Sequence, residues 1–160
     1  MMRRLILMRH AKSSWHDSQL RDHARPLNDR GEHDAPVMGR RLAKLGWVPE
    51  RVISSDSRRT VQTWEAMAPA LGDLAPSFTP DLYLAGAPVV TRLLEEVPAE
   101  VGTVLMLGHN PGFSMTVHWL TGADVDLKTA QAALLETDQD DWSAAAHGKR
   151  AWRLVELVTP

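Results

Sequence analysis

The 160-residue sequence contains no cysteine, which excludes a disulfide scaffold, a zinc–thiolate site and a cysteine nucleophile. The sequence has only one Tyr and two Phe, no lysine-rich tract and a formal net charge of −2, so nucleic acid is not an expected partner. No apolar run approaches the roughly 20 residues that span a bilayer. The N-terminal apolar stretch covers only Leu5 to Met8, too short for a signal-peptide core. We therefore expect a cytoplasmic protein with no membrane partner.

The composition is otherwise that of a folded protein. Hydrophobic residues make up 44% and charged residues 24% of the chain, close to the averages for soluble domains. The length corresponds to about one domain, and no internal repeat, low-complexity tract or linker interrupts it. Residues 1–160 are therefore predicted to form one domain.

Segments of strand-like and helical character alternate along the chain. Short apolar runs predict strands, and apolar residues at helical spacing predict helices. The expected strands are 3–8, 50–54, 77–80, 103–107, 130–136 and 152–158, and the expected helices are 34–45, 58–71, 88–97 and 113–120. Asp34 is the expected cap of the first helix, because Pro36 is tolerated in a first turn but not deep inside a helix. This β-α-β-α order predicts an α/β fold, a three-layer α/β/α sandwich with a mostly parallel central sheet.

Histidines and arginines follow three of the predicted strands, at the edge where such sheets bind ligands. Arg9 and His10 follow the first strand, the segment 55–60 with its two arginines follows the second, and His109 follows strand 103–107. Arginines bind tetrahedral oxyanions, and a neutral imidazole can attack phosphorus and carry the phosphoryl group. A second histidine can donate to the phosphoryl oxygens. The convergence predicts phosphoryl transfer through a phosphohistidine.

The residues at these strand ends resemble the motifs of the histidine phosphatase superfamily, also called phosphoglycerate mutase-like. LMRHAKSS is similar to the RHG motif of that family, with Ala11 in the usual place of glycine. SSDSRRTVQT (54–63) is similar to the second motif, whose spacing selects Arg59 rather than Arg58 as the pocket arginine. GHNP (108–111) resembles the segment that carries the second histidine. Arg25-Pro26-Leu27, with Gly31 beyond, resembles a segment whose arginine reaches the phosphate in the compact branch.

The resemblance covers nearly the whole chain and implies a phosphoglycerate mutase-like fold. Larger members insert a helical lid domain, for which this chain has no room, so it is most similar to the compact SixA-type phosphohistidine phosphatases. By this resemblance His10 is the nucleophile, Arg9, Arg59 and His109 are catalytic, and Arg25 joins them in binding the phosphoryl group. No cofactor and no metal ion are expected.

A general acid for the leaving group is harder to assign. Mutases and many phosphatases of the superfamily use a carboxylate to protonate the leaving oxygen. Asp81, after the third predicted strand, is the nearest candidate, and Glu65 is a poorer one. A phosphoramidate nitrogen can be protonated beforehand, so a missing acid would favour a phosphohistidine substrate over an ordinary ester.

We therefore expect a metal-independent phosphatase that acts through a phosphohistidine on His10 and prefers protein-bound phosphohistidine. A phosphatase for a small phosphorylated metabolite is one alternative. A phospholigand-binding module without turnover is another, although such a module has no need of His10. Two other patterns are weaker. Asp124 and Asp126 do not follow a predicted strand, as a haloacid-dehalogenase nucleophile would. The histidines and aspartates of 16–34 do not have the spacing of metal ligands.

Overall fold

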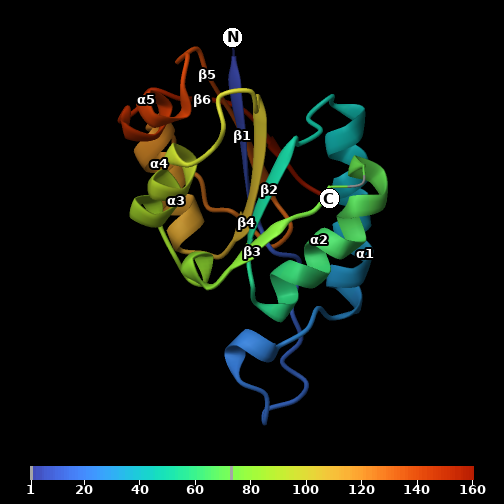
Figure 1. Ribbon diagram of the computed structural model, residues 1–160. Helices are drawn as coiled ribbons and strands as arrows, with labels where there is room; N and C mark the ends of the chain where they lie inside the picture. The colour runs from blue at the N-terminus through green and yellow to red at the C-terminus, as the bar shows by residue number, and fades with distance from the viewer. Residues whose placement is uncertain (1, 73) are drawn as a thin grey trace.

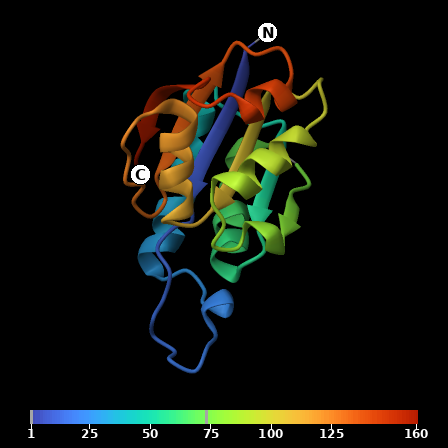
Figure 2. The ribbon, with the colours of Figure 1, turned by 90° about the vertical axis from the view of Figure 1, so that its left-hand side faces the viewer.

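A six-stranded sheet lies between two layers of helices in the computed structural model, which describes residues 2–72 and 74–160 (Figures 1 and 2). Helices α1 and α2 cover one face of the sheet, and α3, α4 and α5 cover the other. The predicted three-layer α/β/α sandwich is confirmed.

The strands and helices follow one another in nearly the predicted order. The strands are β1 (Arg3–Arg9), β2 (Arg51–Ser55), β3 (Ser77–Thr79), β4 (Thr103–Gly108), β5 (Ala132–Thr137) and β6 (Arg153–Val158). The α-helices are α1 (Asp29–Lys44), α2 (Arg58–Leu71), α3 (Ala87–Glu95), α4 (Gly112–Thr121) and α5 (Trp142–His147), and the short 3-10 helices are η1 (Asp22–Ala24) and η2 (Pro80–Leu82). None of the helices in the described part of the chain is long and apolar enough to cross a membrane.

The strand order in the sheet is β3-β2-β4-β1-β5-β6. The first four of these run parallel, while β5 pairs antiparallel with both β1 and β6. The sheet is therefore mostly parallel, as predicted. Arg9 lies opposite Gly108 in the β1–β4 register, so the residues that follow, His10 and His109, emerge side by side, with ring centroids 5.3 Å apart. The ends of β1 and β4 that they follow lie at the lower edge of the sheet in Figure 1.

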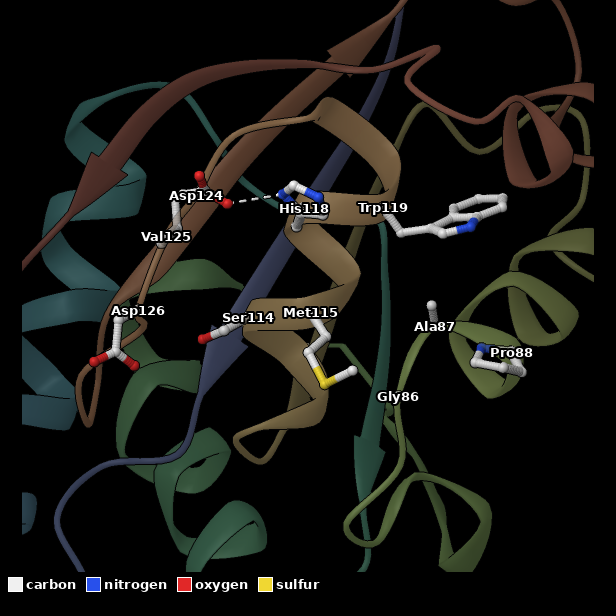
Figure 3. Close-up of a pocket in the computed structure, with 10 residues that line it drawn as sticks. All are labelled: Gly86, Ala87, Pro88, Ser114, Met115, His118, Trp119, Asp124, Val125 and Asp126. Carbon is white, nitrogen blue, oxygen red and sulfur yellow. Dashed lines mark ion pairs between the residues drawn. The ribbon is translucent and has the colours of Figure 1, made fainter.

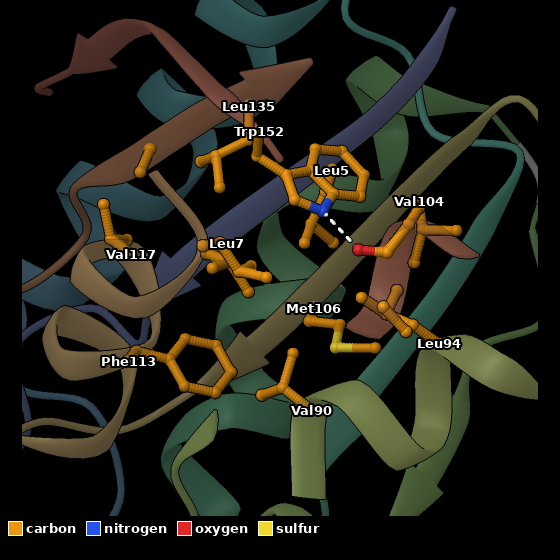
Figure 4. Close-up of a cluster of buried hydrophobic side chains, with 14 of the residues drawn as sticks. Leu5, Leu7, Val90, Leu94, Val104, Met106, Phe113, Val117, Leu135 and Trp152 are labelled. Atoms are coloured by element: carbon orange, nitrogen blue, oxygen red, sulfur yellow. Dashed lines mark hydrogen bonds between the residues drawn. The ribbon is translucent and has the colours of Figure 1, made fainter. Parts of the chain in front are cut away.

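The apolar run of β1 contributes to the core on both faces of the sheet. Leu5 and Leu7 pack in the cluster beneath α3, α4 and α5 (Figure 4), and Ile6 and Met8 pack in the cluster beneath α1 and α2. Because helices cover both faces, the strand is a continuous apolar run rather than an alternating one. Each fully buried side chain of this kind stabilises the fold by about 1.5–3 kcal/mol relative to an exposed one.

Helix α1 begins at Asp29, five residues earlier than predicted. The cap is Asn28, whose side chain accepts a hydrogen bond from Gly31 N at 2.9 Å. The prediction that Asp34 caps the helix is wrong: Asp34 lies within α1, and so does Pro36. Proline forfeits one hydrogen bond inside a helix, and the packing of the α1 apolar face on its neighbours outweighs that loss.

The contact between α1 and α2 is close. A Cβ added at Gly39 of α1 would lie 2.8 Å from the carbonyl oxygen of Met67 in α2. This approach requires glycine, so the two helices are held at a fixed distance on their face of the sheet.

Helix α5 was not predicted. It spans only six residues, too few to show a helical period of apolar side chains. Asp141 caps it by accepting from Ala144 N, and Trp142 anchors it by donating from Nε1 to the carbonyl of Val101 at 2.8 Å.

Candidate active site

His10 directly follows β1, where neighbouring segments hold its backbone. Its N–H donates to the carbonyl of Gly108 at 3.1 Å, and its carbonyl accepts from Ala130 N at 2.9 Å. The side chain is 6% exposed, and Nδ1 lies 2.6 Å from the carbonyl oxygen of Ala11. Because a carbonyl can only accept, Nδ1 carries the proton, and Nε2 keeps its lone pair.

Both site histidines are held in the neutral form. Burial lowers the pKa of His10 from 6.5 to about 3, against the opposite effect of the Ala11 carbonyl, and the guanidinium groups of Arg59 and Arg9 lower it further. Burial also lowers the pKa of His109 to about 3, with His10 and Arg59 adding to the effect. At neutral pH, the His10 imidazole is therefore uncharged, with a free lone pair on Nε2.

Arg59 connects the two histidines. It is the second residue of α2 and is 2% exposed. Its Nε lies 3.3 Å from His10 Nε2, and its Nη2 lies 3.3 Å from His109 Nδ1. His109 Nε2 lies 2.9 Å from Ser55 Oγ, so the imidazole donates to the serine and accepts from Arg59. Arg58 is exposed and does not line the pocket, so the arginine that the motif spacing selects is the one the structure places at the site.

Arg9, at the end of β1, and Arg25, directly after η1, are the two other arginines of the site. Arg9 Nη1 donates to the carbonyl of Leu127 at 3.1 Å, while its buried Nε has no hydrogen-bond partner among the described residues. A bound anion would satisfy this donor. Arg25 is 6% exposed, donates to Ser13 Oγ at 2.7 Å, and stacks with its Cζ 3.5 Å from the centroid of the exposed Trp15 ring.

These groups surround a small polar pocket of about 180 Å³. The structure brings all five of the histidines and arginines assigned from sequence motifs to its wall. The lining residues are Arg9, His10, Lys12, Ser13, Trp15, Arg25, Arg59, Leu84, His109, Asn110 and Thr129. A pocket with three guanidinium groups and two imidazoles suits a phosphoryl group or another tetrahedral oxyanion.

A carboxylate with no motif to mark it lies against two of these arginines. Asp22, in η1, accepts at Oδ1 from Arg25 Nε at 3.1 Å, and Nη2 of the same guanidinium completes the ion pair at 3.0 Å. Its Oδ2 accepts from Arg59 Nη2 at 3.0 Å. The hydroxyl of Tyr83 also donates to Oδ2. Burial acts to raise the pKa of Asp22, but the hydrogen bonds from Tyr83 and Arg59 outweigh it and lower the pKa to about 2. Asp22 is therefore ionised at neutral pH and cannot protonate a leaving group.

The structure does not bring the two candidate general acids to the pocket. The carboxylate of Asp81 pairs with Arg92 at 3.2 Å, and both side chains are half exposed. Glu65 lies on the exposed side of α2, beside a different hollow. The turn of η2 directs Asp81 toward α3, and the residue that reaches the site is Tyr83, whose ring centroid lies 5.3 Å from that of His109.

Two further motif residues hold the site together without lining the pocket. Gln62 Oε1 accepts from Leu27 N at 2.8 Å, and Thr63 Oγ1 accepts from Ala11 N at 3.0 Å. Both belong to α2, so the Gln-Thr pair of the second motif ties the loops that carry His10 and Arg25 to the helix that carries Arg59.

A larger and mostly apolar cavity of about 660 Å³ lies next to the pocket, between α3, α4 and the loop after α4 (Figure 3). Asn110 lines the pocket, and its Oδ1 accepts from Ser114 Oγ of the cavity wall at 2.8 Å. Leu84 lines the pocket two residues before the cavity wall begins. The residues that line the larger cavity are Gly86, Ala87, Pro88, Ser114, Met115, His118, Trp119, Asp124, Val125 and Asp126.

The sequence is similar to those of known proteins. The sequence profile of the histidine phosphatase superfamily (branch 1) matches residues 5–83. An uncharacterized chloroplastic protein of Arabidopsis thaliana is 37% identical over 170 residues, which cover 99% of this chain and 78% of that protein. The chain belongs to the histidine phosphatase superfamily. Its membership supports phosphatase activity.

Solved structures of this superfamily share the whole fold. A candidate phosphohistidine phosphatase SixA of Nakamurella multipartitia matches with a TM-score of 0.88 and 27% identity, covering 100% of this chain and 97% of the other. The corresponding protein of Agrobacterium tumefaciens matches with a TM-score of 0.84 and 26% identity, covering 99% and 98%. The protein histidine phosphatase SixA in complex with tungstate has the same fold, with a TM-score of 0.84 and 22% identity over 98% and 97%. The chain is a SixA-type member of the superfamily.

Proposed function

We propose that this protein is a phosphatase that forms a covalent phosphohistidine on His10 and that its preferred substrate is protein-bound phosphohistidine. The observation that carries the mechanism is the neutral His10 imidazole, whose Nε2 lone pair lies 3.3 Å from the Nε of Arg59. Arg9 lines the same pocket, and its buried Nε has no hydrogen-bond partner among the described residues. A nitrogen of this kind attacks phosphorus while guanidinium groups hold the phosphoryl oxygens.

The reaction has two displacements at phosphorus. In the first, His10 Nε2 forms a bond to phosphorus as the bond to the leaving atom breaks. In the second, water attacks phosphorus, the bond to Nε2 breaks, and phosphate and a proton are released. Arg9, Arg25 and Arg59 stabilise the charge on the phosphoryl oxygens in both transition states. They supply the positive charge that a metal ion would otherwise bring, so the proposed mechanism is metal-independent.

His109 has a different part in these steps. Its Nδ1 accepts from Arg59 and carries no proton of its own. A phosphoryl dianion raises the pKa of a neighbouring imidazole. His109 then takes up a proton at Nδ1 and donates it in a hydrogen bond to a phosphoryl oxygen.

The leaving group argues for a phosphohistidine substrate. No carboxyl group lines the pocket in the part of the chain that the structure describes, and Asp22, which pairs with Arg25 and Arg59, is ionised. The alkoxide of an alkyl phosphate ester is a poor leaving group unless an acid protonates its oxygen. The leaving nitrogen of phosphohistidine takes its proton from solvent before the P–N bond breaks.

The surroundings of the pocket argue for a protein substrate. Trp15 is 72% exposed and Leu84 is 58% exposed at the pocket, and Met115, which is 64% exposed, lines the adjoining apolar cavity. A folded partner that presents a phosphohistidine can bury these apolar side chains at the same time. The tungstate complex of SixA supports an oxyanion site in this fold.

A comparison of kcat/KM values tests the substrate assignment. The substrates are a phosphorylated histidine-containing transfer domain, phenyl phosphate, and a panel of sugar and glycerate phosphates. We expect the phosphoprotein to exceed every ester. A sugar or glycerate phosphate with the higher value would assign the enzyme to small metabolites and leave the His10 mechanism intact.

Trapping of the intermediate tests the mechanism. Acid-labile, base-stable phosphoenzyme is expected from the wild type during turnover and not from His10→Asn. Near-normal turnover by His10→Asn would overturn the proposed mechanism.

A further inference from the structure

Asp22 binds the same two guanidinium groups that would bind an anionic substrate. Its Oδ1 accepts from Nε of Arg25 and forms an ion pair with Nη2 of the same guanidinium, and its Oδ2 accepts from Nη2 of Arg59. The side chain is 43% exposed. The electrostatic field of its negative charge therefore extends into the solvent around the site and is not confined to the two arginines.

The arginines have few hydrogen-bond donors left once these contacts are made. Arg59 donates to the carbonyl and the carboxylate of Asp22 and contacts both histidines. Arg25 donates to Asp22, Ser13 and the carbonyl of Ser14. Nearly all N–H groups of each guanidinium are thus in use. A bound phosphoryl group can accept from the N–H groups of Arg59 that now contact the histidines and from the N–H groups that are still free. A second anionic group would meet N–H groups that already donate to Asp22.

We propose that Asp22 determines specificity by excluding substrates that carry a second anionic group close to the phosphoryl group. This inference rests on the proposed phosphatase activity of the pocket, but not on which phosphoprotein is the substrate. The leaving imidazole of phosphohistidine is neutral or cationic and avoids the repulsion. Phosphorylated hydroxy acids and bisphosphates carry their second negative charge near the first and are disfavoured.

A matched pair of substrates isolates the effect of the second charge. 3-Carboxyphenyl phosphate and 3-carbamoylphenyl phosphate have nearly the same shape and differ by one negative charge. Two like charges separated by several ångströms at a half-exposed site repel enough to change binding by about three- to tenfold. Asp22→Asn should therefore raise the ratio of kcat/KM for the carboxylate over the amide by about three- to tenfold, and less at high salt. Any difference between the two leaving phenols cancels when wild type and variant are compared.

Asp17→Asn is the matched control. Asp17 lies exposed in the same loop, its Oδ1 accepts from Gln19 N, and among the described ion pairs it has none with Arg25 or Arg59. This substitution removes the same charge, and the ratio should stay at the wild-type value. An equal shift in both variants, or a ratio for Asp22→Asn within twofold of wild type, would overturn the proposal.

Binding measurements keep the test independent of turnover. The two corresponding phosphonates are not hydrolysed, and their dissociation constants for wild type and Asp22→Asn give the same ratio by calorimetry. If the wild type hydrolyses neither ester, the proposed phosphatase activity toward esters is wrong, while phosphonate binding still tests the specificity role of Asp22. If the phosphonate ratio is unchanged by Asp22→Asn, the specificity role fails while the proposed function stands.

Discussion

Arg59→Ala is expected to lower kcat by about 10²–10³-fold, whereas Arg58→Ala should leave it unchanged. The two arginines are neighbours in α2, yet Arg59 is 2% exposed and Arg58 lies at the surface. Only Arg59 contacts His10 and His109, each at 3.3 Å. The pair therefore compares the same side chain inside and outside the pocket.

The magnitude follows from the number of groups that Arg59 offers. Loss of one preorganised donor costs about 10²–10³ in turnover, or about 3–4 kcal/mol of transition-state stabilisation. Arg59 supplies donors from both Nε and Nη2, so the loss should lie toward the upper end of that range. Its removal also leaves Asp22 less neutralised, and the freed negative charge opposes a phosphoryl group. Arg59→Lys should be intermediate, because lysine restores the charge without the planar fork.

The assay is phosphate release from an aryl phosphate over a range of concentrations, with the melting temperature of each variant as a control for folding. A fall in kcat and kcat/KM together is expected, since the donors act mainly in the transition state. A raised KM with unchanged kcat would mean that Arg59 only binds the ground state. An equal loss in Arg58→Ala would refute the assignment of the pocket arginine.

Three further predictions test the site in other ways. The free energy of unfolding should fall as the pH drops below 6.5 toward 3, because His10 and His109 stay neutral when folded but take up protons when unfolded; each contributes up to about 1.4 kcal/mol per pH unit. Urea titrations between about pH 7 and about pH 4 measure this, and a slope that His10→Asn does not reduce would contradict it. Met115→Asp should lower kcat/KM for the phosphoprotein by about tenfold or more and spare aryl phosphates, because it places a charge in the apolar cavity; Val48→Asp, at a 44% exposed site before β2, is the control and should change neither. EDTA should not lower turnover, and activity restored by a divalent ion after chelation would overturn the metal-independent mechanism.

The sequence by itself determined the layers of the fold and the edge that bears the site. Short apolar runs such as that of β1 are buried on both faces, and such burial is a local property that the order of residues displays. Once the strands were placed, His10 and His109 had to emerge at the same edge, because β1 and β4 are parallel. The spacing of the second motif was enough to separate Arg59 from Arg58, since the start of a helix directs successive side chains to different sides.

Local patterns were less reliable where tertiary packing opposed them. Pro36 signalled a helix start near Asp34, but the helix begins at Asp29, where the side chain of Asn28 caps the first turn. Asp81 stood at the right place in the sequence for a general acid. The turn of η2 instead pairs it with Arg92.

Only the tertiary structure decided the partners of the arginines and the apolar cavity beside the pocket. Asp22 meets Arg59 across 37 residues of sequence, and Tyr83 meets Asp22 across 61. Such pairs depend on the paths of the loop after β1 and the turn after β3, which no periodic pattern specifies. The cavity likewise combines the start of α3 with α4 and the loop that follows it. A strand can be identified from the residues along it, because its burial alternates or persists locally, but the side chains that meet across loops are determined by how the whole chain packs.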